Sequence, residues 1–325
     1  QVDDGLDRLV RHEQAVGDEL DVRHAARGRH LERRQEALRH ERLGAAPMGL
    51  LAVGPMGSGK TFVIKAFLKE GGRSGIALKN FRSKWVGSTE ANLDRVLATV
   101  KAMGPIALLI DEGDRSFGRQ GDDADGGTSS RVIARLKEFM SDPENRGQVL
   151  FILLTNRPDK LDTDIKRPGR LDRKIPFFYA ETAAERAAVM GAVFERYRVP
   201  VDFPEAHLLA ACEGLEGYSN ADLEALALLA AEFAERAERI DSSLPSPPDA
   251  RVRTGAAATP AVSREVLARA IEDFMPPQET AMVGYMEMLA VAETSRRSLL
   301  PQRFRSLSAR EVQERLAELR RQIQP

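Results

Sequence analysis

The residues best suited to chemistry are eight consecutive ones in a glycine-rich run: Gly54, Pro55, Met56, Gly57, Ser58, Gly59, Lys60 and Thr61. An apolar segment precedes the run and a predicted helix follows it, which is the context that a phosphate-binding P-loop requires. The glycines let backbone N–H groups turn toward phosphates, Lys60 can reach the β- and γ-phosphates, and Thr61 can ligate magnesium. A glycine-rich turn without a ligand is the alternative, but this pattern arises by chance in only about one such chain in a hundred. We therefore predict a site for ATP and Mg²⁺.

Two acidic residues, Asp111 and Glu112, follow the apolar segment Ile106–Ile110. We expect Asp111 to hold magnesium through water and Glu112 to orient or deprotonate the water that attacks the γ-phosphate. Strands often end in acids at solvent, so the pair alone is a weak signal. Downstream of a P-loop it is typical of a Walker B element.

Asn156 follows a third apolar segment, Val149–Leu154. Because ligands of such folds bind at the carboxyl ends of parallel strands, we expect Asn156 to position the lytic water or contact the γ-phosphate. A turn-forming asparagine is the alternative. We favour the catalytic interpretation because three strand ends then carry compatible chemistry.

The segments that position these residues alternate between short apolar runs and amphipathic helices from Gly49 to Phe178, which predicts a parallel sheet covered on both faces. The expected strands are Leu50–Val53, Ile76–Leu78, Ile106–Ile110, Val149–Leu154 and Ile175–Phe178. Beyond Tyr179 the pattern is helical. Capping residues at Thr182, Ser219 and Ser308 start helices, residues 241–260 read as a loop, and two further helices are expected at Glu279–Leu299 and Ala309–Ile323.

Composition and charge limit the classes of protein to which this chain can belong. Hydrophobic residues make up 42% and charged residues 30%, the balance of a soluble globular protein, and no apolar run is long enough to span a membrane. The net charge of −1 gives no global attraction to nucleic acid. No signal peptide is visible, and the single cysteine, Cys212, excludes an internal disulfide and reads as a core residue. We expect a reducing, cytoplasmic setting.

A turn at residues 167–173 carries three arginines and by itself reads as a solvated basic loop. Together with the motifs above, it makes the chain resemble the AAA family, in the central clade of two-ring segregases, proteasomal ATPases and membrane-protein extractors. The resemblance covers roughly residues 41–275. It implies Walker A at Gly54–Thr61, Walker B at Asp111 and Glu112, and sensor 1 at Asn156. Arg170 and Arg173 match arginine fingers that act on the neighbouring subunit's nucleotide.

The chain departs from the family pattern at several positions. Residues 217–223 resemble the helical-lid motif near the adenine, with Asn220 where the family usually has glycine. Met56, Ser58 and Gly113 also depart from the common residues. None of these changes removes a chemically required group, so we expect an active ATPase.

Lys84, Trp85, Val86 and Gly87 resemble the family's first pore loop, in which an aromatic residue projects into the channel of a ring. A buried core tryptophan is the alternative, but a tryptophan between Lys84 and Gly87 in a loop would be an odd core residue. Residues 119–128, rich in Gly and Asp, occupy the place of a second pore loop, although a surface loop would look the same.

The resemblance implies a P-loop NTPase sheet sandwiched by helices, then a small helical lid domain and C-terminal helices. The expected divisions are an N-terminal linker and helical segment at 1–44, an α/β ATPase domain at 45–180, a helical lid domain at 181–277 and a C-terminal helical extension at 278–325.

We expect an ATP-hydrolysing protomer of a homo-oligomeric ring, a hexamer, that threads protein substrates through a central pore. Substrates would arrive through an adaptor or an N-terminal region outside this chain. The alternatives are a nucleic-acid motor or loader on the same core, which needs a basic binding surface, and an ATP-gated assembly scaffold. Acids interleave the last arginines and no aromatic stacking platform accompanies them, so we do not expect a nucleic-acid partner.

Overall fold

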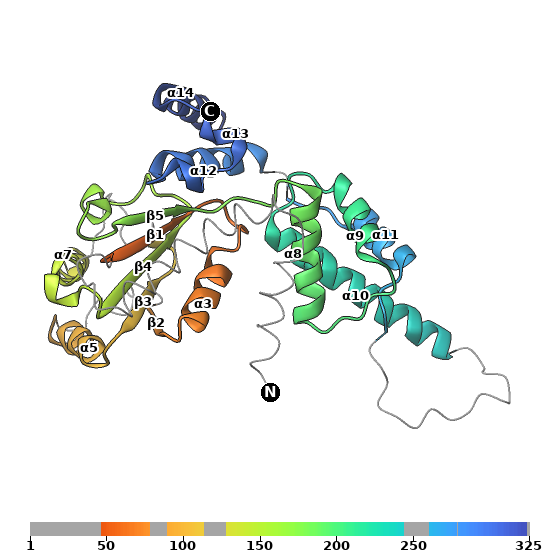
Figure 1. Ribbon diagram of the computed structural model, residues 1–325, viewed down its shortest axis with the longest axis horizontal. Coiled ribbons are helices and arrows are strands. Elements are labelled where there is room, and N and C mark those ends of the chain that lie inside the picture. The colour runs from red at the N-terminus through yellow and green to blue at the C-terminus, as the bar shows by residue number, and fades with distance from the viewer. Residues whose placement is uncertain (1–46, 79–89, 114–127, 244–259, 278, 324–325) are drawn as a thin grey trace. The chain divides into compact units, whose positions relative to one another are not determined.

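The computed structural model describes residues 47–78, 90–113, 128–243, 260–277 and 279–323 (Figure 1). They fall into two compact units. We call residues 47–178 with 279–323 the sheet unit, and residues 179–277 the helical unit. The predicted fold class, a parallel sheet flanked by helices and followed by a helical part, is confirmed.

The sheet has five parallel strands in the order β2-β3-β4-β1-β5. They are β1 (Gly49–Val53), β2 (Ser74–Leu78), β3 (Ile106–Ile110), β4 (Val149–Thr155) and β5 (Arg173–Pro176). The last strand begins two residues earlier than predicted, because β5 is an edge strand on which polar residues are tolerated. Since β4 lies between β3 and β1, the ends of these three strands are neighbours.

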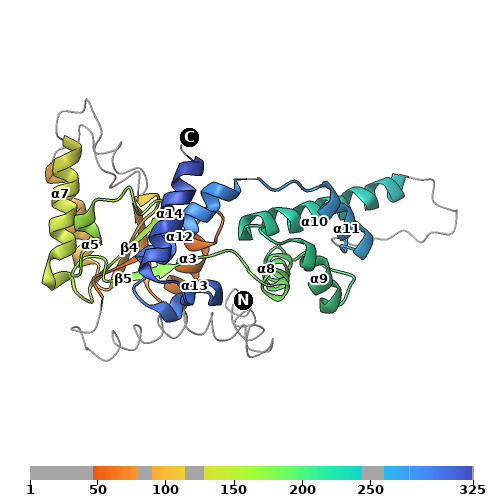
Figure 2. The ribbon, with the colours of Figure 1, turned by 90° about the horizontal axis from the view of Figure 1, so that it is seen from above.

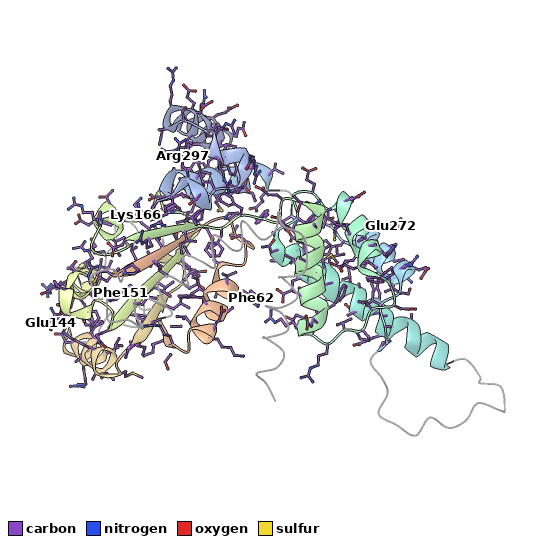
Figure 3. The ribbon with its side chains drawn as sticks, viewed as in Figure 1. Phe62, Glu144, Phe151, Lys166, Glu272 and Arg297 are labelled. Atoms are coloured by element: carbon purple, nitrogen blue, oxygen red, sulfur yellow. The ribbon has the colours of Figure 1, made fainter. Side chains whose placement is uncertain are left out.

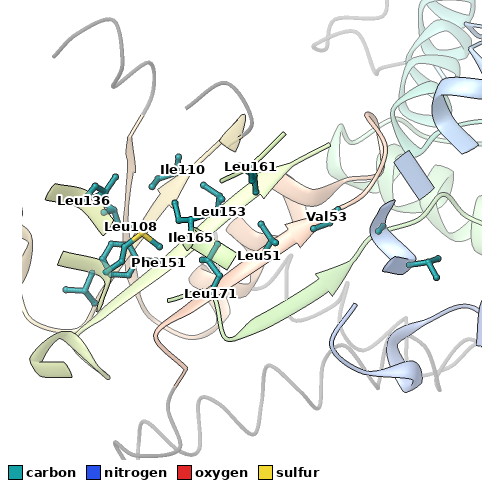
Figure 4. Packing of buried hydrophobic residues seen from close by; sticks show 14 of the residues in the cluster. Leu51, Val53, Leu108, Ile110, Leu136, Phe151, Leu153, Leu161, Ile165 and Leu171 are labelled. Carbon is teal, nitrogen blue, oxygen red and sulfur yellow. The ribbon is translucent and has the colours of Figure 1, made fainter. Parts of the chain in front are cut away.

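Side chains of the buried strands alternate between the two faces of the sheet, as the period of a β-strand requires. On β1, Leu50 and Ala52 pack with α3 (Lys60–Glu70), whereas Leu51 and Val53 face the opposite side. That opposite face, drawn in Figure 4, is covered by α5 (Glu90–Ala102) and α7 (Thr128–Ser141). Short 3-10 turns at Pro143–Asn145 (η2) and Thr163–Lys166 (η3) complete this part of the sheet unit.

The C-terminal helices share the core of the sheet. They are α12 (Thr280–Glu293), η5 (Arg297–Leu299), α13 (Gln302–Arg305) and α14 (Ala309–Ile323). Met288, Val291 and Phe304 belong to the same buried cluster as Leu51 and Val53. Figures 1 and 2 show α12 and α14 side by side next to β5, and α12 contacts β5 and β1. The predicted division of the chain into domains stays a prediction, but these helices pack as part of the sheet unit.

One of the C-terminal helices is shorter than predicted, and the predicted cap of another is present. The helix expected at Glu279–Leu299 ends at Glu293, because Thr294 adopts an extended conformation (φ −64°, ψ 129°). The cap at Ser308 is confirmed: the Glu311 N–H donates to Ser308 Oγ at 3.2 Å, and the Ser308 N–H donates to Glu311 Oε2 at 2.7 Å.

The helical unit has its own core. Its elements are α8 (Ala183–Arg196), α9 (Glu205–Ala211), η4 (Cys212–Gly214), α10 (Asn220–Ser243) and α11 (Arg264–Asp273). Met190, Leu223 and Leu267 are fully buried at its centre. The predicted capping box of Thr182 and Glu185 is present at the start of α8. Among the described helices, none combines the length and apolar character needed to cross a bilayer.

Candidate ATP site

Two glycines set the backbone of the P-loop between β1 and α3. Gly57 has φ 74° and Gly59, the N-cap of α3, has φ 81°, a left-handed conformation that other residues adopt with strain. Gly54 is constrained differently, since a Cβ there would lie 2.2 Å from the carbonyl oxygen of Phe177. The loop thus passes close to the chain beyond β5 and delivers the first N–H groups of helix α3 to the sheet edge.

Lys60 is buried and folds back over its own loop. Its Nζ donates to the carbonyl oxygens of Gly54 (2.9 Å) and Pro55 (2.7 Å), and lies 3.4 Å from Ser58 Oγ. An ammonium held here, at the N-terminus of α3, adds a full positive charge to a site that already favours anions. Triphosphate is the ligand that this combination suits.

The start of α3 and the end of β3 meet through one hydrogen bond, from Thr61 Oγ1 to Asp111 Oδ2 at 3.1 Å. Asp111 Oδ1 in turn accepts the backbone N–H of Glu112 at 2.9 Å. A hydroxyl and a carboxylate side by side are oxygen donors of the kind that Mg²⁺ prefers. The residues present therefore fit a magnesium ion that accompanies a nucleotide.

The backbone turns sharply at the second acid. Glu112 has φ 51°, a left-handed conformation that costs a residue with a side chain about 1 to 3 kcal/mol. Gly113 after it is buried, and a Cβ at Gly113 would lie 2.7 Å from Cγ of Leu153 on β4. The glycine at position 113, where the family usually has another residue, thus has a steric reason. The turn leaves the Glu112 side chain exposed beside Asp111.

Asn156 lies at the same edge of the sheet. The register pairs Val53 with Thr155 and Ile110 with Leu153, so the residues that follow β1, β3 and β4 emerge next to one another. Thr155 is buried, and its Oγ1 accepts the N–H of Arg157 at 3.0 Å, which shapes the turn that carries Asn156. The structure brings the P-loop, the acidic pair and Asn156 together at one place, as predicted.

A family model described as "ATPase family associated with various cellular activities (AAA)" matches residues 50–179, the span that contains all of these residues. The chain contains an AAA ATPase domain. The match, and relatives that are named as ATPases, support ATP hydrolysis by this domain.

Curated relatives support the same family. The chain is 33% identical over 209 residues to an ATPase family protein 2 homolog of Caenorhabditis elegans, covering 63% of this chain and 28% of the relative. It is 34% identical over 183 residues to a cell division cycle protein 48 homolog of Archaeoglobus fulgidus (55% and 24%). It is 31% identical over 239 residues to the peroxisomal ATPase PEX6 of Mus musculus (70% and 24%). The chain spans about a quarter of the length of these relatives.

A solved structure shows the same fold. The AAA domain of FIGL-1, solved in complex with ADP, aligns with a TM-score of 0.57 at 22% identity, over 74% of this chain and 76% of that one.

The two predicted finger arginines of the AAA domain lie far from its P-loop. Arg173 pairs with Leu50 at the amino end of the sheet, whereas the P-loop follows the carboxyl end of β1. Arg170 donates from Nε to Ser141 Oγ (2.6 Å) and from Nη1 to the carbonyl of Asp164 (2.9 Å). Within the described residues, the Arg173 guanidinium makes no hydrogen bond or ion pair. The structure does not bring these arginines to the ATP site of their own chain.

The segment predicted to be a lid motif, residues 217–223, is ordered by its own side chains. Ser219 and Asp222 cap α10 reciprocally, with bonds of 2.9 and 3.0 Å. Asn220, the departure from the family glycine, accepts the N–H of Ala180 at 3.2 Å and so anchors the segment that precedes α8.

Other predicted residues lie outside the described part of the chain. They are the pore-loop residues Lys84, Trp85, Val86 and Gly87, the loop before Thr128, and the first 44 residues. Conversely, three residues that hold the turn after Asn156 were not predicted from the sequence to support the site: Arg157, Asp159 and Tyr285. No local pattern marks Tyr285, because it lies 126 positions from its hydrogen-bonding partner.

Proposed function

We propose that this chain is one protomer of a homohexameric AAA ring that hydrolyses ATP to remodel, unfold or disassemble proteins by drawing them through a central pore. The observation that carries the ATPase part is the hydrogen bond of Thr61 to Asp111, which joins the P-loop to the acidic strand end beside Lys60 and Glu112. The relatives include a cell division cycle protein 48 homolog and a peroxisomal ATPase, which supports a motor of this general kind.

Each residue of the site has a proposed role. Lys60 and the N–H groups of the P-loop bind the phosphates, and Thr61 and Asp111 hold the magnesium. Bound magnesium neutralises charge on the β- and γ-phosphates. Glu112 accepts a proton from the attacking water, and Asn156 orients that water or the γ-phosphate.

Oligomerisation is part of the proposal because Arg173 lies at the opposite end of the sheet from its own P-loop, and the Arg170 carbonyl lies beside Gly49 at that same end. An arginine finger that cannot reach its own nucleotide can act on the neighbour's, as in rings of this family. If each subunit makes this head-to-tail contact with the next one, the ring closes and every nucleotide site receives the arginines of one neighbour. We further propose that the ring works in the cytoplasm, where the single thiol of Cys212 stays reduced.

Protein threading rests on the sequence of the predicted pore loop. A ring that moves with each cycle needs a side chain that grips varied sequences, and an indole gives apolar contact without demanding one hydrogen-bond pattern. Trp85 and Val86 would form the grip. Gly87 would allow the turn, and Lys84 would attract acidic segments.

The test of threading is Trp85→Ala, with the ATPase rate, the thermal melt and the unfolding rate of a model substrate measured on the same variant. We expect hydrolysis and assembly to persist while unfolding of the substrate collapses. A core tryptophan would instead cost roughly 3 to 5 kcal/mol of stability, and hydrolysis would fail with folding. Unimpaired unfolding would reject threading. In parallel, ATPase activity stimulated by single-stranded DNA would favour the nucleic-acid motor, and hydrolysis without stimulation by protein or DNA would favour the scaffold.

A further inference from the structure

The turn after Asn156 is braced by side chains. We call residues 156–160 the Asn156 loop. Arg157 donates to Asp159 through two bonds, from Nε to Oδ1 at 3.0 Å and from Nη2 to Oδ2 at 2.8 Å. The Lys160 N–H donates to the Arg157 carbonyl at 3.1 Å. The fork of the guanidinium thus ties the residue next to Asn156 to the far side of the same loop.

A residue of α12 contacts both partners of this ion pair. The Tyr285 hydroxyl donates to Asp159 Oδ2 at 3.3 Å, and Arg157 Cζ lies 5.2 Å from the centroid of the Tyr285 ring. Tyr285 is buried, with 6% of the residue exposed, so its ring is held in place and Arg157 packs against it. The Asn156 loop therefore depends on a helix from the other end of the chain.

A second contact from α12 reaches the same loop. Lys166, labelled in Figure 3 beside β5, donates from Nζ to the Pro158 carbonyl at 3.0 Å and forms an ion pair with Glu293. Tyr285 and Glu293 are eight residues apart, about 12 Å along a helix. Since α12 is anchored on the sheet by its own buried residues, it can hold the loop at two points.

The electrostatics of the ion pair favour its ionised form. Burial raises the pKa of Asp159, but the hydrogen bonds and charge of Arg157, with the Tyr285 hydroxyl, outweigh burial and hold that pKa below its ordinary value. Burial and the charge of Asp159 raise the pKa of Tyr285, which keeps the hydroxyl protonated and able to donate.

We infer that Tyr285 is a positioning residue for ATP hydrolysis, which acts through Arg157 and Asp159 to hold Asn156 at the edge of the sheet. This inference rests on the proposed role of Asn156. Thr155 fixes Asn156 from the strand side, and the Tyr285 contacts fix it from the loop side. A catalytic amide needs a fixed backbone, because a displacement of about 1 Å can cost on the order of a hundredfold in rate.

The test combines substitutions at Tyr285 and Asn156 in the full chain. Tyr285→Phe removes the hydroxyl but keeps the ring over Arg157, and we expect kcat to fall about threefold. Tyr285→Leu also removes the ring, and we expect a fall of about tenfold. Affinity for a fluorescent ATP analogue should stay unchanged in both, because neither contact involves the P-loop. The control is Tyr197→Phe in the helical unit, which removes a hydroxyl that donates to Glu224 at 2.7 Å and should leave kcat unchanged.

A double-mutant cycle separates positioning from general stability. If Tyr285 acts through Asn156, then Tyr285→Leu in an Asn156→Ala background should lower kcat by less than about twofold. Additive losses, or an unchanged kcat in both Tyr285 variants, would overturn the inference. If Tyr285→Leu fails to fold, the same double-mutant cycle with Tyr285→Phe tests whether Tyr285 acts through Asn156. If Asn156→Ala itself hydrolyses ATP at the parental rate, the proposed role of Asn156 is wrong, and the inference falls with it.

Discussion

Ser295 bonds both backbone groups of Lys174 and so closes part of the free edge of the sheet. The Lys174 N–H donates to Ser295 Oγ at 3.1 Å, and the Ser295 hydroxyl donates to the Lys174 carbonyl at 3.2 Å. Next to it, Glu293 accepts Lys174 Nζ at 2.8 Å and pairs with Lys166. An edge strand otherwise presents unpaired backbone groups, so these contacts bind the C-terminal helices to β5.

Replacing Glu293 should weaken the sheet unit. Glu293→Gln leaves two partly buried lysines without their carboxylate, and we expect the free energy of unfolding to fall by roughly 2 to 4 kcal/mol. Urea denaturation followed by circular dichroism measures this. Glu314→Gln is the control, because its pair with Arg310 is 60% to 87% exposed and should contribute at most about 0.5 kcal/mol. Equal effects of the two variants would contradict the role of Glu293.

Glu112 and Lys60 should separate turnover from binding. Glu112→Gln keeps Asp111 and Thr61, so nucleotide should still bind, while kcat falls by about 10² to 10⁴ because the attacking water loses its base. Lys60→Ala should lose binding instead. Binding of a fluorescent nucleotide and steady-state phosphate release measure the two effects. A Glu112→Gln protein that turns over at nearly the parental rate would show that another group is the base.

The two predicted finger arginines should differ in their effect on stability. Either substitution by alanine should reduce hydrolysis by about 10³ to 10⁵, the contribution of an arginine finger. Arg170→Ala should also destabilise the sheet unit by about 1 to 2 kcal/mol, since its bonds to Ser141 and Asp164 are lost, whereas Arg173→Ala should not. Thermal melts and phosphate release distinguish the two.

Action in trans is tested by mixing subunits. Arg173→Ala subunits mixed with Lys60→Ala subunits should regain part of the activity, at interfaces where each supplies its intact half. No recovery in mixed rings whose assembly is confirmed would argue for a protomer that hydrolyses ATP alone.

Cys212 should report on the integrity of the helical unit. Its side chain is buried against Met190, and burial raises the pKa of the thiol to about 11, with the charge of Arg186 opposing. A thiol reagent should therefore react with one equivalent only after unfolding. Above about pH 8.5 the thiol ionises in the unfolded chain but not in the folded one. Stability should then fall as pH rises toward 11, and Cys212→Ala should remove this component. Fast labelling of the folded protein at pH 7 would contradict the buried position.

Local chemistry allowed much of this domain to be predicted from the sequence. The P-loop conformation follows from Gly57 and Gly59, which need positive φ, and the helix starts follow from Thr182, Ser219 and Ser308, whose partners lie three residues away. Alternation of apolar segments and helices predicted a parallel sheet because both faces must be buried. Nearby residues decide such features, so a single sequence contains the information.

Only the tertiary structure decided how distant segments meet. The Thr61 to Asp111 bond spans 50 positions and depends on the strand order. The contact of Tyr285 with Asp159 spans 126 positions, and nothing in the apolar pattern of α12 distinguishes the face that packs on β5 from the face that supports the Asn156 loop. Hydrophobic burial brings α12 to the sheet without regard to register. The packing of Met288 and Val291 sets the final position of α12, together with the ion pairs of Glu293 with Lys166 and Lys174. These contacts form only when the whole sheet unit is assembled.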